Sequence, residues 1–227
     1  KIDIERSRSY VDDDLTIQDN NGHGTSVAGI IAQLAPEARM VSYRVIGETS
    51  GDSEWTINAL IQAANDGNDI INVSLGTYKC SDIESELLTI TAFERAVQYV
   101  ESKGCIVVAA AGNQSRNLDQ YYEEDHVKFM PGCLDGVITV LATNKDGLAS
   151  YSNYGSNIDY CAPGGDLVYI DGAIDISQWI YCLYPTTMDN GLTAIGIPQG
   201  YTFSYGTSLA VPEVTAALAD ILSKMPE

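Results

Sequence analysis

Short apolar segments alternate along the chain with longer amphipathic segments, and this alternation restricts the fold more than any other feature. The apolar segments predict strands at 40–46, 69–75, 105–111, 137–143 and 158–162. The amphipathic segments predict helices at 54–65 and 84–102, and further helices begin near His23 and Ser208. Apolar strands joined by helices are typical of a parallel sheet covered on both faces. We therefore expect an α/β fold of three layers, with a mainly parallel β-sheet between two layers of helices.

Length and composition predict one folded unit over residues 1–227. Of the 227 residues, 45% are hydrophobic, which is enough for a single core. The formal net charge is -19. Such a charge disfavours nucleic acids and anionic membrane surfaces as partners, because both repel an acidic protein. No apolar run approaches about 18 residues, so the sequence predicts no membrane span.

Two short motifs supply a base and a nucleophile. They are NGHGT at 21–25 and GTSLAVP at 206–212. A serine hydroxyl becomes an effective nucleophile when a neutral imidazole within hydrogen-bond reach takes its proton. Small and apolar residues follow both motifs, so we expect His23 and Ser208 to open helices, with Pro212 in a first helical turn. Ser208 would then lie at the positive end of a helix dipole.

Together with two further segments, these motifs resemble the subtilisin-like serine proteases. DIINVSLG at 69–76 is similar to the substrate-binding strand of that family, and VVAAAGN at 107–113 is similar to its oxyanion segment. The resemblance implies a subtilisin-like serine endopeptidase in which Ser208 attacks a peptide carbonyl, His23 transfers the proton and Asn113 stabilises the oxyanion. It also implies that a peptide or protein substrate binds along Ser74, Leu75, Gly76, Ala111 and Gly112.

The acidic member of the triad is the missing part of the pattern. In the family the order is Asp, His, Ser, and the aspartate ends an apolar strand upstream of the histidine. The carboxylates considered for this role are Asp3, Glu5, Asp12, Asp13 and Asp14, which lie in a largely charged or polar stretch and do not end an apolar strand. We therefore expect a nicked or processed enzyme whose aspartate lies on a separate fragment, with or without a propeptide, and whose relatives continue beyond Met225. Self-cleavage at an exposed acidic loop would produce such pieces.

Several departures from the family narrow the expected function. The segment 32–36 joins the His23 helix almost directly to the next strand, so we expect neither the calcium-binding loop of many relatives nor a cofactor. The acidic cluster at 12–14 is interpreted as solvated surface. An addition at 78–88 borders the expected specificity pocket, which favours narrow specificity, as in the bacterial leader peptidases that mature modified peptides. Lys79 or Arg116 would favour an acidic side chain before the scissile bond, unless each is an ordinary solvated cation.

The cysteines and the remaining segments carry less information. The five cysteines are an odd number, so at least one is unpaired. Cys105 is predicted to be a core residue, and no C-x-x-C spacing indicates zinc. We expect a secreted or cell-surface bacterial protein, in which one or two disulfides are compatible with the count. His126 is predicted to be a surface residue, and 166–198 an irregular insertion.

Two classes of function remain open. The first is a serine endopeptidase that becomes active when the fragment with the aspartate is bound. The second is a catalytically inactive subtilisin-like protein that binds peptides or partners. Retention of His23, Asn113 and Ser208 together favours the first class, because a binding protein has no need of all three.

Overall fold

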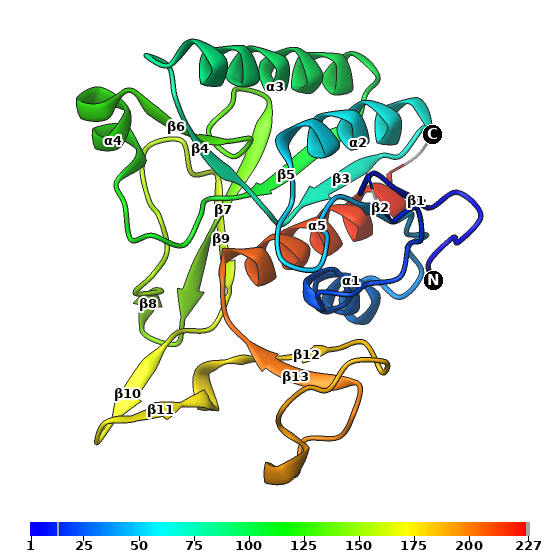
Figure 1. Cartoon of the computed structure of the whole chain (residues 1–227), viewed down its shortest axis with the longest axis vertical. Helices are drawn as coiled ribbons and strands as arrows, with labels where there is room; N and C mark the ends of the chain where they lie inside the picture. Colours follow the sequence, from blue (N-terminus) through cyan, green and yellow to red (C-terminus); the bar gives the residue numbers. More distant parts are fainter. Residues whose placement is uncertain (13, 226–227) are drawn as a thin grey trace.

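A parallel sheet forms the centre of the computed structural model, which describes residues 1–12 and 14–225 (Figure 1). Its strands are, in spatial order, β3 (Ile70–Val73), β5 (Ile106–Ala110), β7 (Val137–Asn144) and β9 (Tyr160–Pro163). Each neighbouring pair in this order runs parallel. The short β8 (Gly147–Leu148) folds back antiparallel on the end of β7. The predicted parallel sheet is confirmed.

Helices cover both faces of this sheet and complete the predicted three layers. On one face α2 (Ser53–Asn65) packs beside α3 (Glu84–Ser102). On the other face lies α5 (Thr207–Ser223), with α1 (His23–Leu34) packed against it. All four helices occur where the sequence predicts them.

The residues of β5 are apolar throughout because both faces of the strand are buried. Successive side chains of a strand point to opposite faces of the sheet. Val107 and Ala109 belong to the buried cluster that includes α2 and α3, whereas Val108 and Ala110 belong to the cluster that includes α5. Because a helix covers each face, neither set of side chains is left in water, and an alternating polar pattern would leave polar groups buried.

The strand predicted at 40–46 is reduced to β2 (Tyr43–Arg44). It pairs in parallel with β1 (Arg8–Ser9) in a two-stranded sheet of its own. Isolated bridges at Met40 and Ile46 flank it, so the backbone is extended over the predicted range while regular pairing is confined to two residues. The main sheet and the β1–β2 pair therefore share no ladder.

A second small sheet lies beyond the carboxyl end of β3. It contains β4 (Thr77–Cys80) and β6 (Val127–Met130), which pair antiparallel. The predicted addition at 78–88 forms most of β4 and the start of α3. Helix α4 (Leu118–Asp125) was not predicted, because its polar sequence has little apolar periodicity. The Asn117 side chain caps its first turn.

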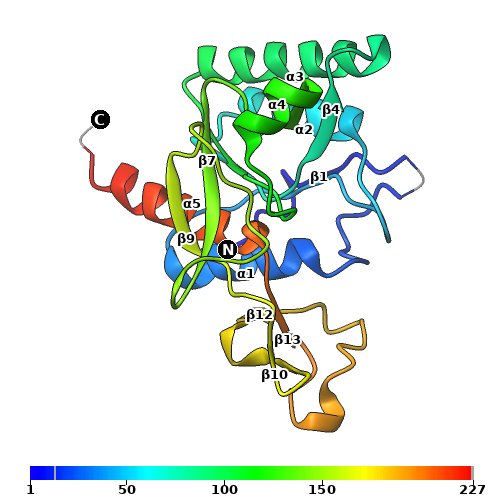
Figure 2. The same cartoon turned by 90° about the vertical axis from the view of Figure 1, so that its left-hand side faces the viewer.

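The segment 166–204 forms an arm that extends away from the helices and the main sheet (Figures 1 and 2). It contains the hairpin of β10 (Val168–Ile170) with β11 (Ala173–Asp175), and the pair β12 (Ile180–Leu183) with β13 (Tyr201–Ser204). The prediction of a wholly irregular insertion at 166–198 was therefore wrong. Its strands have three or four residues, too few for a clear period.

The environments of Cys105 and His126 are as the sequence predicts. Cys105 is buried, as predicted, and all five cysteines are free thiols. His126 is exposed, as predicted, and its Nδ1 lies 2.9 Å from the Asp82 carboxylate. None of the helices within 1–12 and 14–225 is both long and apolar enough to cross a membrane.

We predict that Asp166→Asn loosens the base of the arm. The Asp166 side chain is buried and accepts hydrogen bonds from Asn144 Nδ2 at 2.6 Å, Ser150 N at 2.9 Å and Ser150 Oγ at 2.6 Å. A carboxamide would place a donor against these donors, so the free energy of unfolding should fall by about 2 kcal/mol in urea titrations. Asp171→Asn, an equal charge change at an exposed site of the arm, should leave it unchanged.

Candidate active site

His23 begins α1 directly after a tight turn, as the sequence predicts. Gly22 has φ 94°, a left-handed conformation that favours glycine, and the Tyr184 ring lies against it. Asp19 holds the turn together. Its Oδ1 accepts the N–H groups of Asn21 at 3.0 Å and Gly22 at 2.7 Å, and its Oδ2 accepts the N–H of Thr25 at 2.8 Å and the Thr25 hydroxyl at 2.6 Å. The Asp19 carboxylate thus organises the backbone around the histidine.

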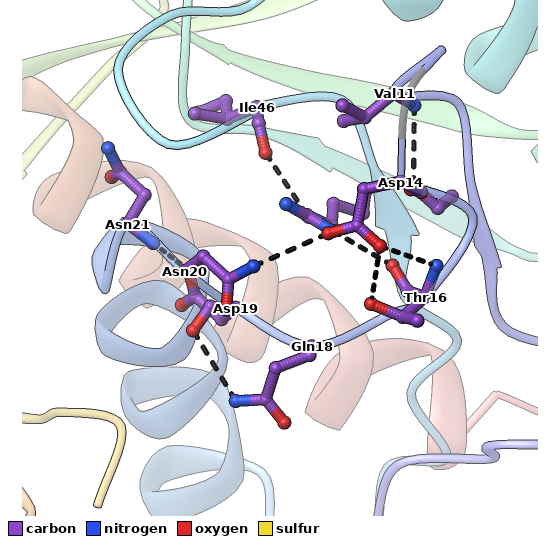
Figure 3. A network of polar contacts seen from close by, with 10 residues as sticks. Val11, Asp14, Thr16, Gln18, Asp19, Asn20, Asn21 and Ile46 are labelled. Atoms are coloured by element: carbon purple, nitrogen blue, oxygen red, sulfur yellow. Dashed lines mark hydrogen bonds and ion pairs between the residues drawn. The ribbon is translucent and has the colours of Figure 1, made fainter. Parts of the chain in front are cut away.

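An ion pair attaches the preceding loop to β2 (Figure 3). The Arg44 side chain is only 7% exposed, and its Nη1 donates to Asp14 Oδ2 at 2.5 Å and to the Thr16 carbonyl at 3.0 Å. Asn20 Nδ2 donates to the same Asp14 oxygen at 3.3 Å, which connects the pair to the turn before His23. The hydrogen bond from the Arg44 guanidinium lowers the pKa of Asp14 to about 2.

This ion pair corrects the prediction of a solvated acidic cluster at 12–14. Asp12 is exposed as predicted, and Asp13 lies outside the described residues. Asp14 is engaged by a buried cation supplied by the chain itself, a contact that links positions far apart in the sequence. Within the described part of the chain, no three or more His, Cys, Asp or Glu side chains are grouped so as to hold a metal ion.

Ser208 lies in the first turn of α5, which begins at Thr207. The predicted helix start is confirmed, but Pro212 lies inside the helix and not in its first turn. Because proline has no N–H, it cannot donate to the carbonyl of Ser208, four residues earlier. That carbonyl is therefore left out of the helical hydrogen-bond ladder.

Asn113 is tied to the residue immediately before Ser208. Its Oδ1 accepts the Thr207 N–H at 2.9 Å and the Thr207 hydroxyl at 2.7 Å. A backbone N–H only donates, so the oxygen of the amide must face Thr207. The Asn113 Nδ2 group, which makes no hydrogen bond to any described residue, is available as a donor. An ideal Cβ at Gly206 would lie 3.3 Å from Nδ2, so glycine keeps this space open.

One pocket brings most of the predicted site residues together. It has a volume of about 230 Å³ and is lined by His23, Ile46, Ser74, Leu75, Gly76, Ala110, Gly112, Asn113, Gln114, Phe129, Thr207 and Ser208. We call it the active-site pocket. Of the predicted residues only Ala111, which is fully buried, is absent from this lining. Neighbouring Ala110 contributes in its place.

The electrostatics of His23 suit a general base. Burial lowers the pKa of the imidazole, and the negative charge of Asp19 opposes that shift in part. The net direction is downward from 6.5, so the imidazole is neutral at pH 7 and free to accept a proton. A second pocket of about 230 Å³ lies on another side of His23 and is lined partly by the arm, through Tyr184, Thr202, Phe203 and Ser204.

None of the five upstream carboxylates considered from the sequence is hydrogen-bonded to His23 where the structure describes them. Asp3 pairs with Arg39 at 2.5 Å, and Asp14 pairs with Arg44. Glu5 and Asp12 are exposed. Asp19, which the sequence reasoning did not consider, is the carboxylate whose charge acts on the imidazole, but its oxygens already serve the turn.

Neither cation proposed for substrate selection lines the active-site pocket. The Arg116 guanidinium stacks on the Tyr121 ring at 4.1 Å, and Lys79 lies within β4. Gln114 and Phe129 occupy the wall and floor instead. Gln114 follows the predicted oxyanion residue directly, so adjacency could have indicated it. No sequence signal connects Phe129 to this pocket, because only the pairing of β6 with β4 brings it there.

Comparisons with known proteins find one matching family and several similar proteins. The sequence matches the family model described as "Subtilase family" over residues 1–227. It is 33% identical to the epidermin leader peptide-processing serine protease EpiP of Staphylococcus epidermidis, over 89% of this chain and 49% of that protein. It is 30% identical to the nisin leader peptide-processing serine protease NisP of Lactococcus lactis subsp. lactis, over 92% of this chain and 34% of that protein.

A solved structure extends the likeness to three dimensions. A crystal structure described as a lanthipeptide protease superposes with a TM-score of 0.92 at 33% identity, covering 98% of this chain and 68% of that one. The chain spans half or less of the length of the two leader peptide-processing relatives. The likeness therefore concerns one part of those proteins.

We predict that the Asp14–Arg44 pair makes stability depend on pH in the acidic range. The pKa of Asp14 falls from 3.8 to about 2 on folding, so its contribution is complete above about pH 4 and is lost as the pH falls toward 2. Asp14→Asn should flatten this part of the stability profile, measured by urea unfolding at several pH values. Asp12→Asn should retain the full dependence, and equal profiles for the two variants would contradict the assignment.

Proposed function

The chain belongs to the subtilase family, and on that premise we propose that it is a serine endopeptidase that hydrolyses peptide bonds through Ser208, His23 and Asn113. The observation that carries the proposal is the convergence of these three side chains on one pocket. His23 and Ser208 lie in the first turns of α1 and α5, and Asn113 lies in the loop that follows β5. Only the tertiary fold therefore brings these three residues together. The bonds from Thr207 to Asn113 further link the oxyanion donor to the nucleophile's helix.

In the proposed reaction Ser208 Oγ attacks the carbonyl carbon of the scissile bond while the neutral His23 imidazole takes its proton. The tetrahedral intermediate collapses when the imidazolium returns that proton to the leaving amine. A water molecule then repeats the sequence on the acyl-enzyme and releases the acid product. No atom of the chain is consumed, and the lowered pKa of His23 keeps the base form populated at neutral pH.

The oxyanion is proposed to accept hydrogen bonds from Asn113 Nδ2 and from the Ser208 N–H. A helix leaves its first N–H groups without intrahelical partners, and Ser208 is the second residue of α5. The Asn113 amide is held by its oxygen, so its nitrogen is oriented before substrate arrives. Orientation in advance is what makes such donors effective, because they need not reorganise during the reaction.

We propose that the carboxylate that orients His23 belongs to a strand outside residues 1–227. Successive strands β2 and β3 are joined by α2, a connection that ordinarily keeps two parallel strands in one sheet. Within the described residues each of them has an edge without a ladder partner. One added strand would join the β1–β2 pair to the main sheet and bring its carboxyl end toward His23. This strand would have the same effect whether it belongs to a fragment separated by processing or to a continuous part of the protein.

The substrate is proposed to be a peptide or precursor protein cleaved at one or few sites in a secreted or cell-surface setting. Leu75 and Gly76 make no backbone hydrogen bonds to other described residues, so their backbone groups are free to pair with an extended peptide. The names of EpiP and NisP describe leader peptide processing, and the arm and the β4–β6 pair border the site as dedicated recognition elements would.

The first experiment is intact mass spectrometry after incubation with a fluorophosphonate probe, using protein expressed from its complete reading frame. The probe should add one label, and Ser208→Ala should abolish it. Ser85→Ala, which removes an exposed hydroxyl of α3, should still be labelled. A folded sample that resists labelling would contradict the enzyme proposal and favour an inactive, peptide-binding protein.

Removal of the oxyanion donor should affect turnover more than binding. Asn113→Ala is expected to lower kcat by about 100-fold or more with little change in KM, the cost established for the corresponding donor in a relative. The measurement is steady-state kinetics on a cleavable peptide, with the thermal midpoint as a check on folding. An effect confined to KM would contradict the role assigned to Asn113.

The orienting carboxylate can be located by substitution in the same full reading frame. Each aspartate outside 1–227 that ends an apolar segment is replaced by asparagine, and one such change should lower kcat by about 10⁴. Hydrogen exchange should also show the amides of β2 and β3 becoming protected when that segment is present. Full activity in every variant would contradict the proposed origin of the acid.

A further inference from the structure

Phe129 closes the floor of the active-site pocket. Its side chain comes from β6 and reaches between the backbone segments at Gly76 and Gly112. An ideal Cβ at Gly112 would lie 3.0 Å from the Phe129 Cζ atom, and one at Gly76 would lie closer still. Phe129 is 5% exposed, and its ring packs on Tyr78 with the ring centroids 4.9 Å apart. The two glycines thus leave space that an aromatic ring of the enzyme already fills.

A chain of hydrogen bonds beside this floor determines how the Gln114 amide is oriented. Asn153 Oδ1 accepts the backbone N–H groups of Gln114 at 3.1 Å and Arg116 at 3.0 Å, so its Nδ2 is the donor to the Tyr78 hydroxyl at 2.8 Å. The hydroxyl must then donate its own proton to Gln114 Oε1, 2.7 Å away.

A second donor confirms that orientation. The Asn113 N–H lies 2.9 Å from the same Gln114 Oε1, and a backbone N–H can only donate. The amide oxygen of Gln114 therefore accepts from the Tyr78 hydroxyl and the Asn113 N–H, and Asn153 Nδ2 is a third donor to it at 3.5 Å. Its Nε2 group, with two N–H donors, has no hydrogen-bond partner in the described part of the chain, and the residue lines the active-site pocket.

We propose that this pocket selects a substrate residue whose side chain ends in an acceptor oxygen, a carboxylate or a carboxamide, on the acyl side of the scissile bond. The inference rests on the proposed function, because it takes Ser208 and Asn113 to hold the carbonyl of that residue. The side chain of the residue then enters the space between 74–76 and 112–114. There it meets the donors of Gln114 Nε2, while Phe129 limits its depth.

A substrate side chain is favoured when it can accept the hydrogen bonds that Gln114 Nε2 donates. A leucine or phenylalanine side chain would cover Gln114 Nε2 and remove its water without replacing the hydrogen bonds, and Phe129 would prevent deep burial of the apolar group. A carboxylate or carboxamide oxygen replaces that water. Because Gln114 is exposed before binding, the discrimination should be modest, about tenfold in kcat/KM.

The test uses peptides that differ only at the acyl-side residue, with Glu, Gln, Asp, Asn, Leu, Phe or Lys at that position. For the unmodified protein, the best acceptor residue should exceed Leu, Phe and Lys by about tenfold in kcat/KM. Comparison of Glu with Gln and of Asp with Asn distinguishes a carboxylate from a carboxamide. If fluorophosphonate labels Ser208 but Leu, Phe or Lys is preferred, this inference fails while the proposed function stands.

Gln114→Glu tests the role of the two Nε2 donors directly. It keeps an oxygen for the Asn113 N–H and the Tyr78 hydroxyl but replaces the two Nε2 donors by an acceptor. Peptides with Glu or Asp should lose about tenfold or more in kcat/KM relative to Lys, with labelling of Ser208 retained. Gln33→Glu, the same charge change at an exposed position of α1, should not alter the order of substrates. An unchanged order in Gln114→Glu would overturn the assignment.

Phe129→Ala tests the floor independently. Removing the ring should raise kcat/KM for Phe and Leu peptides relative to Glu by about tenfold, because the space between the glycines becomes available. Phe129→Leu is the milder variant if the alanine protein does not fold, and it should shift the order in the same direction. An order that neither variant changes would show that Phe129 does not limit the pocket.

Discussion

The parallel course of β3 and β5 is the constraint on which the site depends. Parallel neighbours end at the same edge of a sheet, so the segments 74–76 and 111–114 emerge side by side. The space between them is the active-site pocket. From this pocket the Asn113 side chain accepts a hydrogen bond from Thr207 at the start of α5. Helices α1 and α5, which carry His23 and Ser208 in their first turns, pack against each other on one face of the sheet, and both residues line this pocket.

Rigidity around the site comes from polar groups that are satisfied by the chain itself. Asp19 occupies its oxygens with the turn before His23, and Arg44 holds the loop through Asp14. On the opposite wall Asn153 fixes Tyr78, which in turn fixes Gln114. Beside these networks lie two groups that make no hydrogen bond to any described residue, the Nε2 of Gln114 on one side and the imidazole of His23 on the other. The substrate side chain and the orienting acid proposed above would supply the complementary chemistry.

The family's fold is common to proteases with very different substrates, so selectivity must come from what surrounds the shared centre. Here the surroundings are the β4–β6 pair, which supplies Phe129 to the floor, and the arm, which supplies Tyr184 and Phe203 to the second pocket beside His23. Both are absent from the alternating strand and helix pattern that defines the core. Neither of them contributes a strand to the main sheet.

The sequence by itself determined the layers and the four large helices, and it indicated the residues that we propose for the reactive centre. Apolar strands report burial on both faces, and local motifs such as NGHGT and GTSLAVP carry their chemistry in adjacent positions. Only the tertiary structure decided the ion pair of Asp14 with Arg44, the position of Phe129 under Gly76 and Gly112, the orientation of the Gln114 amide and the strands of the arm. Each of these depends on contacts between distant segments or on strands too short to show a period, and neither leaves a local pattern in the sequence.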